Sequence, residues 1–302
     1  MTDQPTCLDL QTLRAAIEGD AAAFRCVTEL QPAGGAGDKV YPSTYEGGTY
    51  AFEERVIDGQ RIKCVLLDSV QSQANRLELT LLEGYRAGKF KFPLVQIDFG
   101  KAKEEETRNV GVVTALETPH RLADGMFWGS EFEEDNKQRK AFRHRDPKKA
   151  SSCGRRFEGA SIANATPLFE LCPTALVFGM WDSYKQKLAG VQGEKFQRAL
   201  VSEIVGFDAE PGARPTSRID PVIRTTKDIS IDITDDGWQV VEKGKTKLSE
   251  VGLGNVTPSL RDKDTGLPHH GGVTIRFARQ TCVLSLPALR RLRFPLERDG
   301  KL

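Results

Sequence analysis

Alternating apolar and polar positions predict a β-hairpin early in the chain. The segment TYAFEERVIDGQRIKCVLLDS, residues 49–69, contains two strand patterns joined at Asp58-Gly59, a pair that tolerates the positive φ angles of a tight turn. A different spacing precedes it, because apolar residues in LDLQTLRAAI, residues 8–17, recur at helical intervals. The pattern thus predicts a helix followed by a hairpin.

The second strand of this hairpin leads directly into a predicted helix, in the stretch LLDSVQSQANRLE at residues 66–78. Asp68 or Ser69 is expected to cap the helix by accepting a hydrogen bond from a free backbone N–H. The apolar face of the helical wheel comprises Val70, Ala74, Leu77 and Leu81. The other face carries short neutral side chains where a solvated helix usually has Lys and Glu. Free backbone N–H groups and the helix dipole also favour negative charge at a helix N-terminus, so the start of this helix is a candidate phosphate-binding site.

The later part of the chain also alternates between strand and helix patterns. FPLVQIDF at residues 92–99 predicts a strand, and the apolar run at residues 175–181 predicts a buried central strand. EKFQRALVSEIVGF at residues 194–207 predicts an amphipathic helix. A second hairpin is predicted to turn at Asp236-Gly237, and the last elements are a strand and a short helix beginning near Ser285.

Interleaved strands, hairpins and helices without a repeating period predict an α+β fold. We expect one domain over residues 1–302 with two insertions, at about residues 118–165 and about residues 208–268. Segments of that length exceed what a compact domain needs for its connections, and such segments are usually functional or disordered. The first insertion is a possible thumb or finger that projects from the sheet.

Charge is balanced over the whole chain but unevenly distributed. The 302 residues include 43 Lys and Arg against 42 Asp and Glu. The acidic stretch EFEEDN is followed by the basic KQRKAFRHRDPKKASSCGRR, residues 137–156. A local basic patch is compatible with a nucleic acid along part of the surface and equally with a solvated loop. No apolar run reaches the roughly 18 residues of a membrane span, so we expect a cytoplasmic protein.

Motifs for catalysis or cofactor binding are missing from the sequence. The six cysteines and four histidines show no metal-ligand spacing, and neither a phosphate-binding GxxxxGK[ST] loop nor a GxSxG motif occurs. Asp232, Asp235 and Asp236 are potential Mg²⁺ ligands, but their place in a predicted turn suits a structural role better. We therefore expect no catalytic residue, metal or cofactor.

Four stretches of the chain together resemble a known family. They are LLDSVQSQANRLE, HRLAD at residues 120–124, GLGNVTPS at residues 252–259 and GGVTIRF at residues 271–277. From about residue 41 to about residue 295, the chain is similar to the backbone subunit of type I-U CRISPR surveillance complexes, also called I-G Cascade. That family belongs to the RAMP superfamily of repeat-associated CRISPR proteins.

The resemblance implies an RRM-like, or ferredoxin-like, palm sheet with a helical or finger insertion and a thumb-like β-hairpin. It also implies several copies assembled head to tail along the spacer of one CRISPR RNA, which they present to target DNA alongside other Cascade subunits. A protein that serves every spacer must hold phosphates and 2′-OH groups and leave the base edges free. The neighbouring acidic and basic stretches are suited to a contact between copies.

The predicted RNA contacts gather at the start of the helix after the first hairpin, where hydroxyl, amide and guanidinium groups can bind phosphate oxygens. They are Ser69, Gln71, Ser72, Gln73, Asn75 and Arg76, joined by His120, Arg121, Lys148, Lys149 and Thr274. Two alternatives stay open. One is a metal-dependent endoribonuclease, as in the backbone subunits of type III complexes, and the other is a general RNA-binding protein outside CRISPR.

Overall fold

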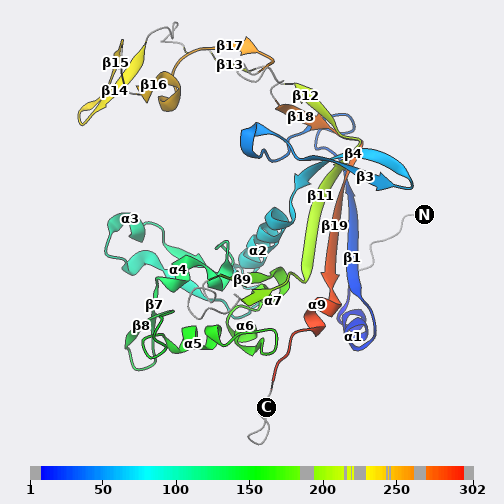
Figure 1. Cartoon of the computed structure of the whole chain (residues 1–302), viewed down its shortest axis with the longest axis vertical. Coiled ribbons are helices and arrows are strands. Elements are labelled where there is room, and N and C mark those ends of the chain that lie inside the picture. Colours follow the sequence, from blue (N-terminus) through cyan, green and yellow to red (C-terminus); the bar gives the residue numbers. More distant parts are fainter. Residues whose placement is uncertain are drawn as a thin grey trace, which may run out of the picture. The chain divides into compact units, whose positions relative to one another are not determined.

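A computed structural model describes residues 8–183, 194–213, 216–218, 220, 229–242, 244, 246–261 and 270–295. The fold is α+β, as predicted from the sequence, with short helices and antiparallel strand pairs (Figure 1). Within these ranges, no helix has the length and apolar character needed to cross a bilayer. The RRM-like palm and the two insertions remain predictions, and part of the second insertion lies outside the described residues.

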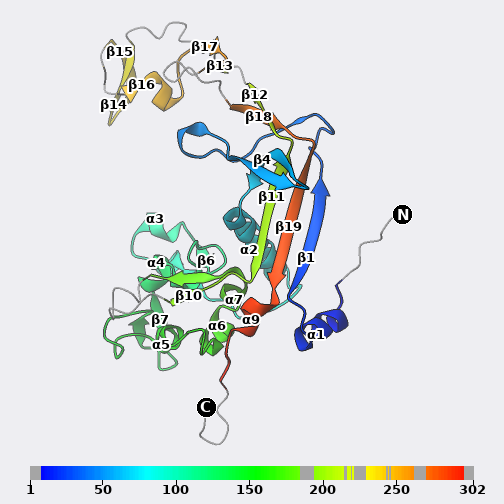
Figure 2. The same cartoon turned by 45° about the vertical axis from the view of Figure 1, so that its right-hand side comes forward.

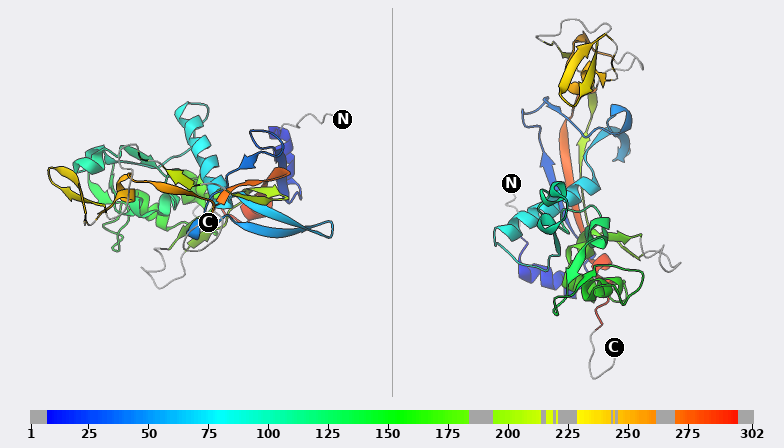
Figure 3. Two further views of the ribbon diagram at one scale, coloured as in Figure 1. Left: turned by 90° about the horizontal axis from the view of Figure 1, so that it is seen from above. Right: turned by 90° about the vertical axis from the view of Figure 1, so that its left-hand side faces the viewer.

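The predicted first hairpin is confirmed as β3 (Phe52–Ile57) and β4 (Gln60–Asp68). Ile57 pairs with Gln60, so the turn consists of Asp58 and Gly59, whose φ angles are 51° and 79°. Positive φ at both central residues matches the right-handed twist of the strands. Figure 3 shows this hairpin in light blue as a long two-stranded ribbon.

The largest sheet has five strands in the order β1-β19-β11-β4-β3. Its further members are β1 (Ala23–Leu30), β11 (Leu200–Phe207) and β19 (Phe277–Ser285), which run side by side in Figure 2. β11 is central and its last three residues are buried, whereas most residues of the edge strand β1 are exposed. The predicted final strand and helix are confirmed by β19 and α9 (Leu286–Arg290), which Ser285 caps.

Two predicted elements were wrong. Residues 194–207 form β10 (Glu194–Phe196) and β11 instead of a helix, because the segment is buried within sheets where strand pairing overrides a helical apolar spacing. The apolar run at residues 175–181 is α7 (Thr174–Phe178) followed by β9 (Met180–Asp182). Gly179 separates them with φ +80°, a conformation that a side chain disfavours.

The second predicted hairpin is present with a shift of one residue. β14 (Ser230–Thr234) pairs with β15 (Gly237–Val241), and Thr234 lies opposite Gly237. The turn therefore consists of Asp235 and Asp236, and Gly237 opens the second strand. The strand predicted at residues 92–99 is shorter than expected, as β5 (Gln96–Asp98).

The chain divides into two compact units. Unit 1 comprises residues 1–28, 68–204 and 280–302. Its core gathers Phe127, Phe142 and Phe157, with ring centroids 6.2 Å and 6.0 Å apart in successive pairs. Its other elements are α1 (Leu10–Glu18), α2 (Val70–Arg86), η2 (Phe99–Lys101), α3 (Glu105–Arg108), β6 (Val112–Thr114), η3 (Arg121–Ala123), α4 (Gly125–Trp128), β7 (Glu131–Glu133), β8 (Arg139–Ala141), α5 (Ser152–Glu158) and α6 (Thr166–Leu171).

Unit 2 comprises residues 29–67 and 205–279. Cys64, Val205 and Phe207 form a buried cluster in this unit, and the ring of Phe277 stacks on Phe207 at a centroid distance of 4.9 Å. Its remaining elements are β2 (Lys39–Val40), η1 (Glu46–Gly48), β12 (Glu210–Ala213), β13 (Thr216–Arg218), β16 (Thr246–Lys247), η4 (Leu248–Val251), β17 (Val256–Ser259) and β18 (His270–Thr274).

Replacement of Gly154 by Ala is expected to destabilise unit 1. A Cβ atom at this position of α5 would lie 1.5 Å from the Phe142 carbonyl oxygen, so the helix must move away from the core. Overpacking of this kind costs about 1–3 kcal/mol of the free energy of unfolding, measurable by chemical denaturation. Gly129→Ala is the control, because its nearest neighbour would lie at 3.7 Å. Equal stability of the two variants would contradict the prediction.

Candidate functional site

The start of α2 is capped as the sequence predicted. Ser69 is the N-cap residue, and its Oγ accepts a hydrogen bond from the Ser72 backbone N–H at 3.2 Å. Asp68, the other predicted cap, instead contacts two side chains of the first helical turns. Its Oδ2 lies 2.5 Å from Gln73 Nε2 and 2.9 Å from Arg76 Nε. The carboxylate thus holds the exposed Arg76 guanidinium in place.

Gln73 faces the protein interior. Its side chain is only 5% exposed, and its Oε1 accepts hydrogen bonds from Ser202 Oγ and Gln280 Nε2, each at 2.8 Å. Together with Asp68, these contacts use both ends of the amide. Gln73 therefore joins α2 to β11 and β19, and its amide is bound within the protein and does not face a ligand.

Four of the predicted contacts meet in one groove of unit 1. Gln71 and Asn75 are one helical turn apart on α2 and line the groove together with His120 and Arg121. Its volume is about 560 Å³. The other lining residues are Pro119, Phe178, Gly179, Met180, Trp181, Lys195, Phe196, Gln197 and Arg198. Ser69, Ser72 and Arg76 are not among the lining residues: Ser69 is the N-cap of α2, and Ser72 and Arg76 each follow a lining residue along the helix.

Trp181 and Lys195 are groove residues that the sequence analysis missed. Trp181 lies between two buried residues of β9, so strand alternation turns its side chain outward, where it is 53% exposed. Lys195 of β10 is its cross-strand partner and is exposed as well. The short pattern Met-Trp-Asp after Gly179 could have revealed Trp181 if residues 175–181 had not been assigned to one strand.

A buried ion pair fixes the strand that carries Trp181. Asp182 accepts two hydrogen bonds from Arg143, at 3.1 Å and 2.9 Å, and Arg143 also contacts Glu158 at 3.2 Å. The side chains of Arg143 and Asp182 are almost fully buried. This bidentate ion pair holds β9 in place, so the Trp181 indole ring is preorganised in the groove.

Arg121 supports the groove from inside. Its side chain is 7% exposed and binds Glu78 with two contacts of 2.6 Å, while Nη1 donates to the Gly179 carbonyl at 2.7 Å. Burial raises the pKa of the Glu78 carboxyl, and the Arg121 guanidinium opposes that rise. Because each of its three guanidinium nitrogens donates a hydrogen bond within the protein, Arg121 positions the groove residues, and we propose no direct ligand contact for it.

Arg198 supplies a half-buried cation to the groove. Its Nε donates to the Phe178 carbonyl at 3.1 Å. Burial, and after it repulsion from Arg121, lowers the pKa of the Arg198 guanidinium. An arginine nevertheless stays protonated in proteins, so the groove keeps a positive charge beside that of Lys195.

The other predicted contacts lie elsewhere in the structure. Lys148 and Lys149 are exposed in the loop before α5, where the Lys148 N–H donates to Asp146 Oδ1 at 2.9 Å. Thr274 belongs to unit 2 and is half-buried, with its hydroxyl 3.4 Å from the Glu210 carbonyl. These three residues are not part of the groove lining.

The described residues contain neither a cluster of potential metal ligands nor a disulfide. Across those residues, no group of three His, Cys, Asp or Glu side chains is placed to hold a metal ion. Cys64, Cys153 and Cys172 are buried free thiols, as expected for reduced structural cysteines, and burial raises the pKa of each thiol.

An exposed indole, two cations and neutral amides in one groove are the features with which proteins bind single-stranded nucleic acids. The chain belongs to the family of CRISPR-associated protein GSU0053, which it matches over residues 24–211, more than half of its length. No curated protein matches it. The predicted membership in a CRISPR-associated family is thereby confirmed, and the matched span includes every residue of the groove.

Proposed function

We propose that the protein is a noncatalytic CRISPR RNA-binding backbone subunit of a type I effector complex. It assembles head to tail along the spacer of the guide, in the cytoplasm, and presents the guide for pairing with target DNA together with other Cascade subunits. The groove of unit 1 is the observation that carries this proposal. Family membership supports the CRISPR context, and the side chains of the groove support the ligand class.

The groove is suited to RNA of any sequence. Lys195 and Arg198 attract phosphates without reading a base, and an indole ring stacks with every base because each has a π-face. Gln71 and Asn75 add neutral donors and acceptors that can hold a phosphate or a 2′-OH in a fixed geometry. A subunit that must accept every spacer needs this combination rather than groups that recognise particular base edges.

The proposed contact set follows from these positions. In the groove it consists of Gln71, Asn75, His120, Trp181, Lys195 and Arg198. Beside the groove, the Ser69 hydroxyl, the Ser72 hydroxyl and the Arg76 guanidinium lie at the start of α2, where free backbone N–H groups and the helix dipole favour an anion. One RNA backbone passing along the N-terminal turns of α2 would contact both sets.

The RNA that accompanies the protein in cells tests the proposal. The protein is expressed with a CRISPR array and the neighbouring CRISPR genes, purified by a tag, and its RNA is sequenced. We expect processed guides that share a repeat-derived flank, and less RNA per protein for Asn75→Ala and Lys195→Ala. Arg61→Ala is the control, because it also removes one positive charge, at an exposed position in unit 2. Random RNA or none would contradict the proposal.

Incubation of the purified protein with Mg²⁺ and labelled RNA separates the proposed subunit from the endoribonuclease alternative. We expect intact RNA. Cleavage that is lost on replacing Asp232, Asp235 or Asp236 by Ala would assign the protein to the nuclease class instead.

A further inference from the structure

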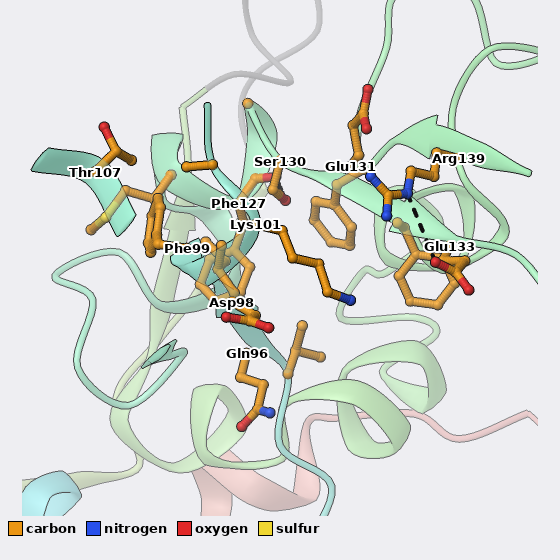
Figure 4. A pocket seen from close by; sticks show the side chains of 17 residues that line it. Gln96, Asp98, Phe99, Lys101, Thr107, Phe127, Ser130, Glu131, Glu133 and Arg139 are labelled. Atoms are coloured by element: carbon orange, nitrogen blue, oxygen red, sulfur yellow. Dashed lines mark hydrogen bonds and ion pairs between the residues drawn. The ribbon is translucent and has the colours of Figure 1, made fainter. Parts of the chain in front are cut away.

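An open pocket of unit 1 carries charges of both signs. It has a volume of about 450 Å³ and lies between β5, η2, α4 and β7 (Figure 4). Asp98, Glu131 and Glu133 supply carboxylates to its lining, whereas Lys101 and Arg139 supply cations, and Arg139 lies 3.8 Å from Glu133. Because acids and bases share the lining, charge identifies no ligand class for this pocket. The five-stranded sheet, by contrast, carries a pair of groups with one defined chemistry.

Two cysteines of unit 1 face each other across neighbouring strands. Cys26 lies in the edge strand β1 and Cys282 in β19, the strand beside it, and Figure 2 shows the two strands running in opposite directions. The Leu286 backbone N–H donates to the Ala22 carbonyl at 3.0 Å, which sets the register of this pair. Antiparallel strands advance in opposite directions from that bond, so the fourth residue after Ala22 lies opposite the fourth residue before Leu286. These residues are Cys26 and Cys282.

The spacing of opposite residues suits a disulfide. Every second pair along an antiparallel ladder exchanges backbone hydrogen bonds, so Cys26 and Cys282 form such a pair, whose Cα atoms lie about 5.5 Å apart. Disulfides join Cα atoms that are roughly 4.4–6.8 Å apart. Side chains at opposite positions also project from the same face of a sheet. No backbone movement is therefore needed to bring the two sulfurs together.

The titration of Cys282 agrees with this placement. Burial raises the pKa of the Cys282 thiol, a hydrogen bond with Ser202 lowers it, and the neighbouring Cys26 thiol adds to the rise. The last effect is electrostatic and requires the two sulfur atoms to be near each other.

Cys26 is the more accessible of the two thiols. It is exposed, and its Sγ lies 3.9 Å from the Thr28 hydroxyl, whereas Cys282 is half-buried. The remaining cysteines of the described ranges are buried. We propose that Cys26 and Cys282 form a reversible disulfide, with a low-molecular-weight disulfide such as oxidised glutathione as the oxidant.

The reaction is a thiol–disulfide exchange in two steps. The Cys26 thiolate attacks one sulfur of the small disulfide, which breaks its S–S bond and releases one small thiolate. The Cys282 thiol then loses its proton to solvent, and its thiolate attacks the Cys26 sulfur of the mixed disulfide and releases the second small thiolate. Two protein thiols are oxidised and one small disulfide is reduced to two small thiols, which take up the two protons.

The disulfide fastens the edge of the sheet. β1 has a single neighbouring strand, and most of its residues are exposed. A covalent link from β1 to β19 holds the edge strand in the sheet and restricts the unfolded chain, because it closes the long loop between residues 26 and 282. Exposed disulfides are readily reduced, so small thiols can reverse the link. This inference goes beyond the proposed function and does not rest on it.

Oxidation of the purified full-length chain tests the pair. The chain carries Cys7→Ser, because Cys7 lies outside the described residues, and is treated with oxidised glutathione under native conditions. We expect the loss of two thiols, a fall in mass of two hydrogen atoms, and a linked pair of peptides containing Cys26 and Cys282. The same chain with Cys282→Ser should stop at a mixed disulfide between Cys26 and glutathione. A persistent mixed disulfide in the chain that retains both cysteines, or a link to another cysteine, would overturn the proposal.

The midpoint of chemical denaturation provides a second readout. We expect the oxidised chain to unfold at a higher denaturant concentration than the reduced chain, and an excess of small thiol to restore the lower midpoint. Cys26→Ser and Cys282→Ser, treated in the same way, should show no such shift. Equal midpoints of the oxidised and reduced chains would overturn the stabilising role of the link. Linkage of Cys26 to Cys282 in denaturant as efficient as under native conditions would overturn the role of strand pairing.

Discussion

Replacement of Arg121 by Met is expected to lower the free energy of unfolding by about 3–5 kcal/mol, the cost of leaving a buried charge without its partner. Glu78 is buried in α2 and has Arg121 as its bidentate partner at 2.6 Å. The substitution also removes the donor to the Gly179 carbonyl, which lies where α7 ends and β9 begins. Chemical denaturation followed by tryptophan fluorescence measures the loss.

Two controls show whether the buried charge causes that loss. Arg86→Met breaks the more exposed pair with Glu117, so its cost should be about 1 kcal/mol or less. The double replacement of Glu78 by Gln and Arg121 by Met removes both charges and should recover most of the stability. A double variant as unstable as Arg121→Met would show that packing around the Arg121 stem, and not the unpaired carboxylate, dominates.

Replacement of Trp181 by Ala is expected to weaken the binding of single-stranded RNA by about 1–3 kcal/mol, roughly five- to 150-fold, if one base stacks on the indole. The buried pair of Asp182 and Arg143 holds β9 in place, so the loss should arise from the missing ring and not from unfolding of the strand. Fluorescence anisotropy with labelled RNA at fixed salt measures the affinity, and RNAs of unrelated sequence should give the same result.

Trp128→Ala is the matched control, because Trp128 is also partly exposed in unit 1 but lies outside the groove. Trp181→Phe should retain part of the affinity, since a smaller ring still stacks. Lys195→Met should act through charge instead and reduce the slope of log affinity against log salt by about 0.7. Unchanged affinity of Trp181→Ala would exclude the indole as a stacking surface.

Much of the first part of the fold is predictable from the sequence because the signals are local. Asp58-Gly59 selects a tight turn whatever surrounds it, and Ser69 caps α2 through contacts within four residues. The errors fall where distant partners decide the structure. Residues 194–207 have a helical apolar spacing, but β4 and β19, each more than 60 residues away along the chain, pair with β11 and make it a strand.

The candidate site shows the same division. Gln71 and Asn75 were predicted from the composition of one helix face, and both line the groove. Gln73 was predicted to contact RNA as well, because its side-chain amide is chemically similar to those of Gln71 and Asn75. Only the tertiary structure shows that its side chain points toward Ser202 and Gln280, more than a hundred residues away.

The sequence by itself determined the α+β class, the hairpin, the capped helix and the CRISPR-associated family. Turns, helix caps and sequence motifs each depend on residues that are close together in the chain. The tertiary structure decided which polar side chains face outward and which residues share the groove. Trp181 and Lys195 meet only through the pairing of β9 with β10, and Arg121 is withdrawn from solvent only because it has Glu78 as its buried partner. Burial and partnership depend on residues far apart in the chain, and no local pattern specifies them.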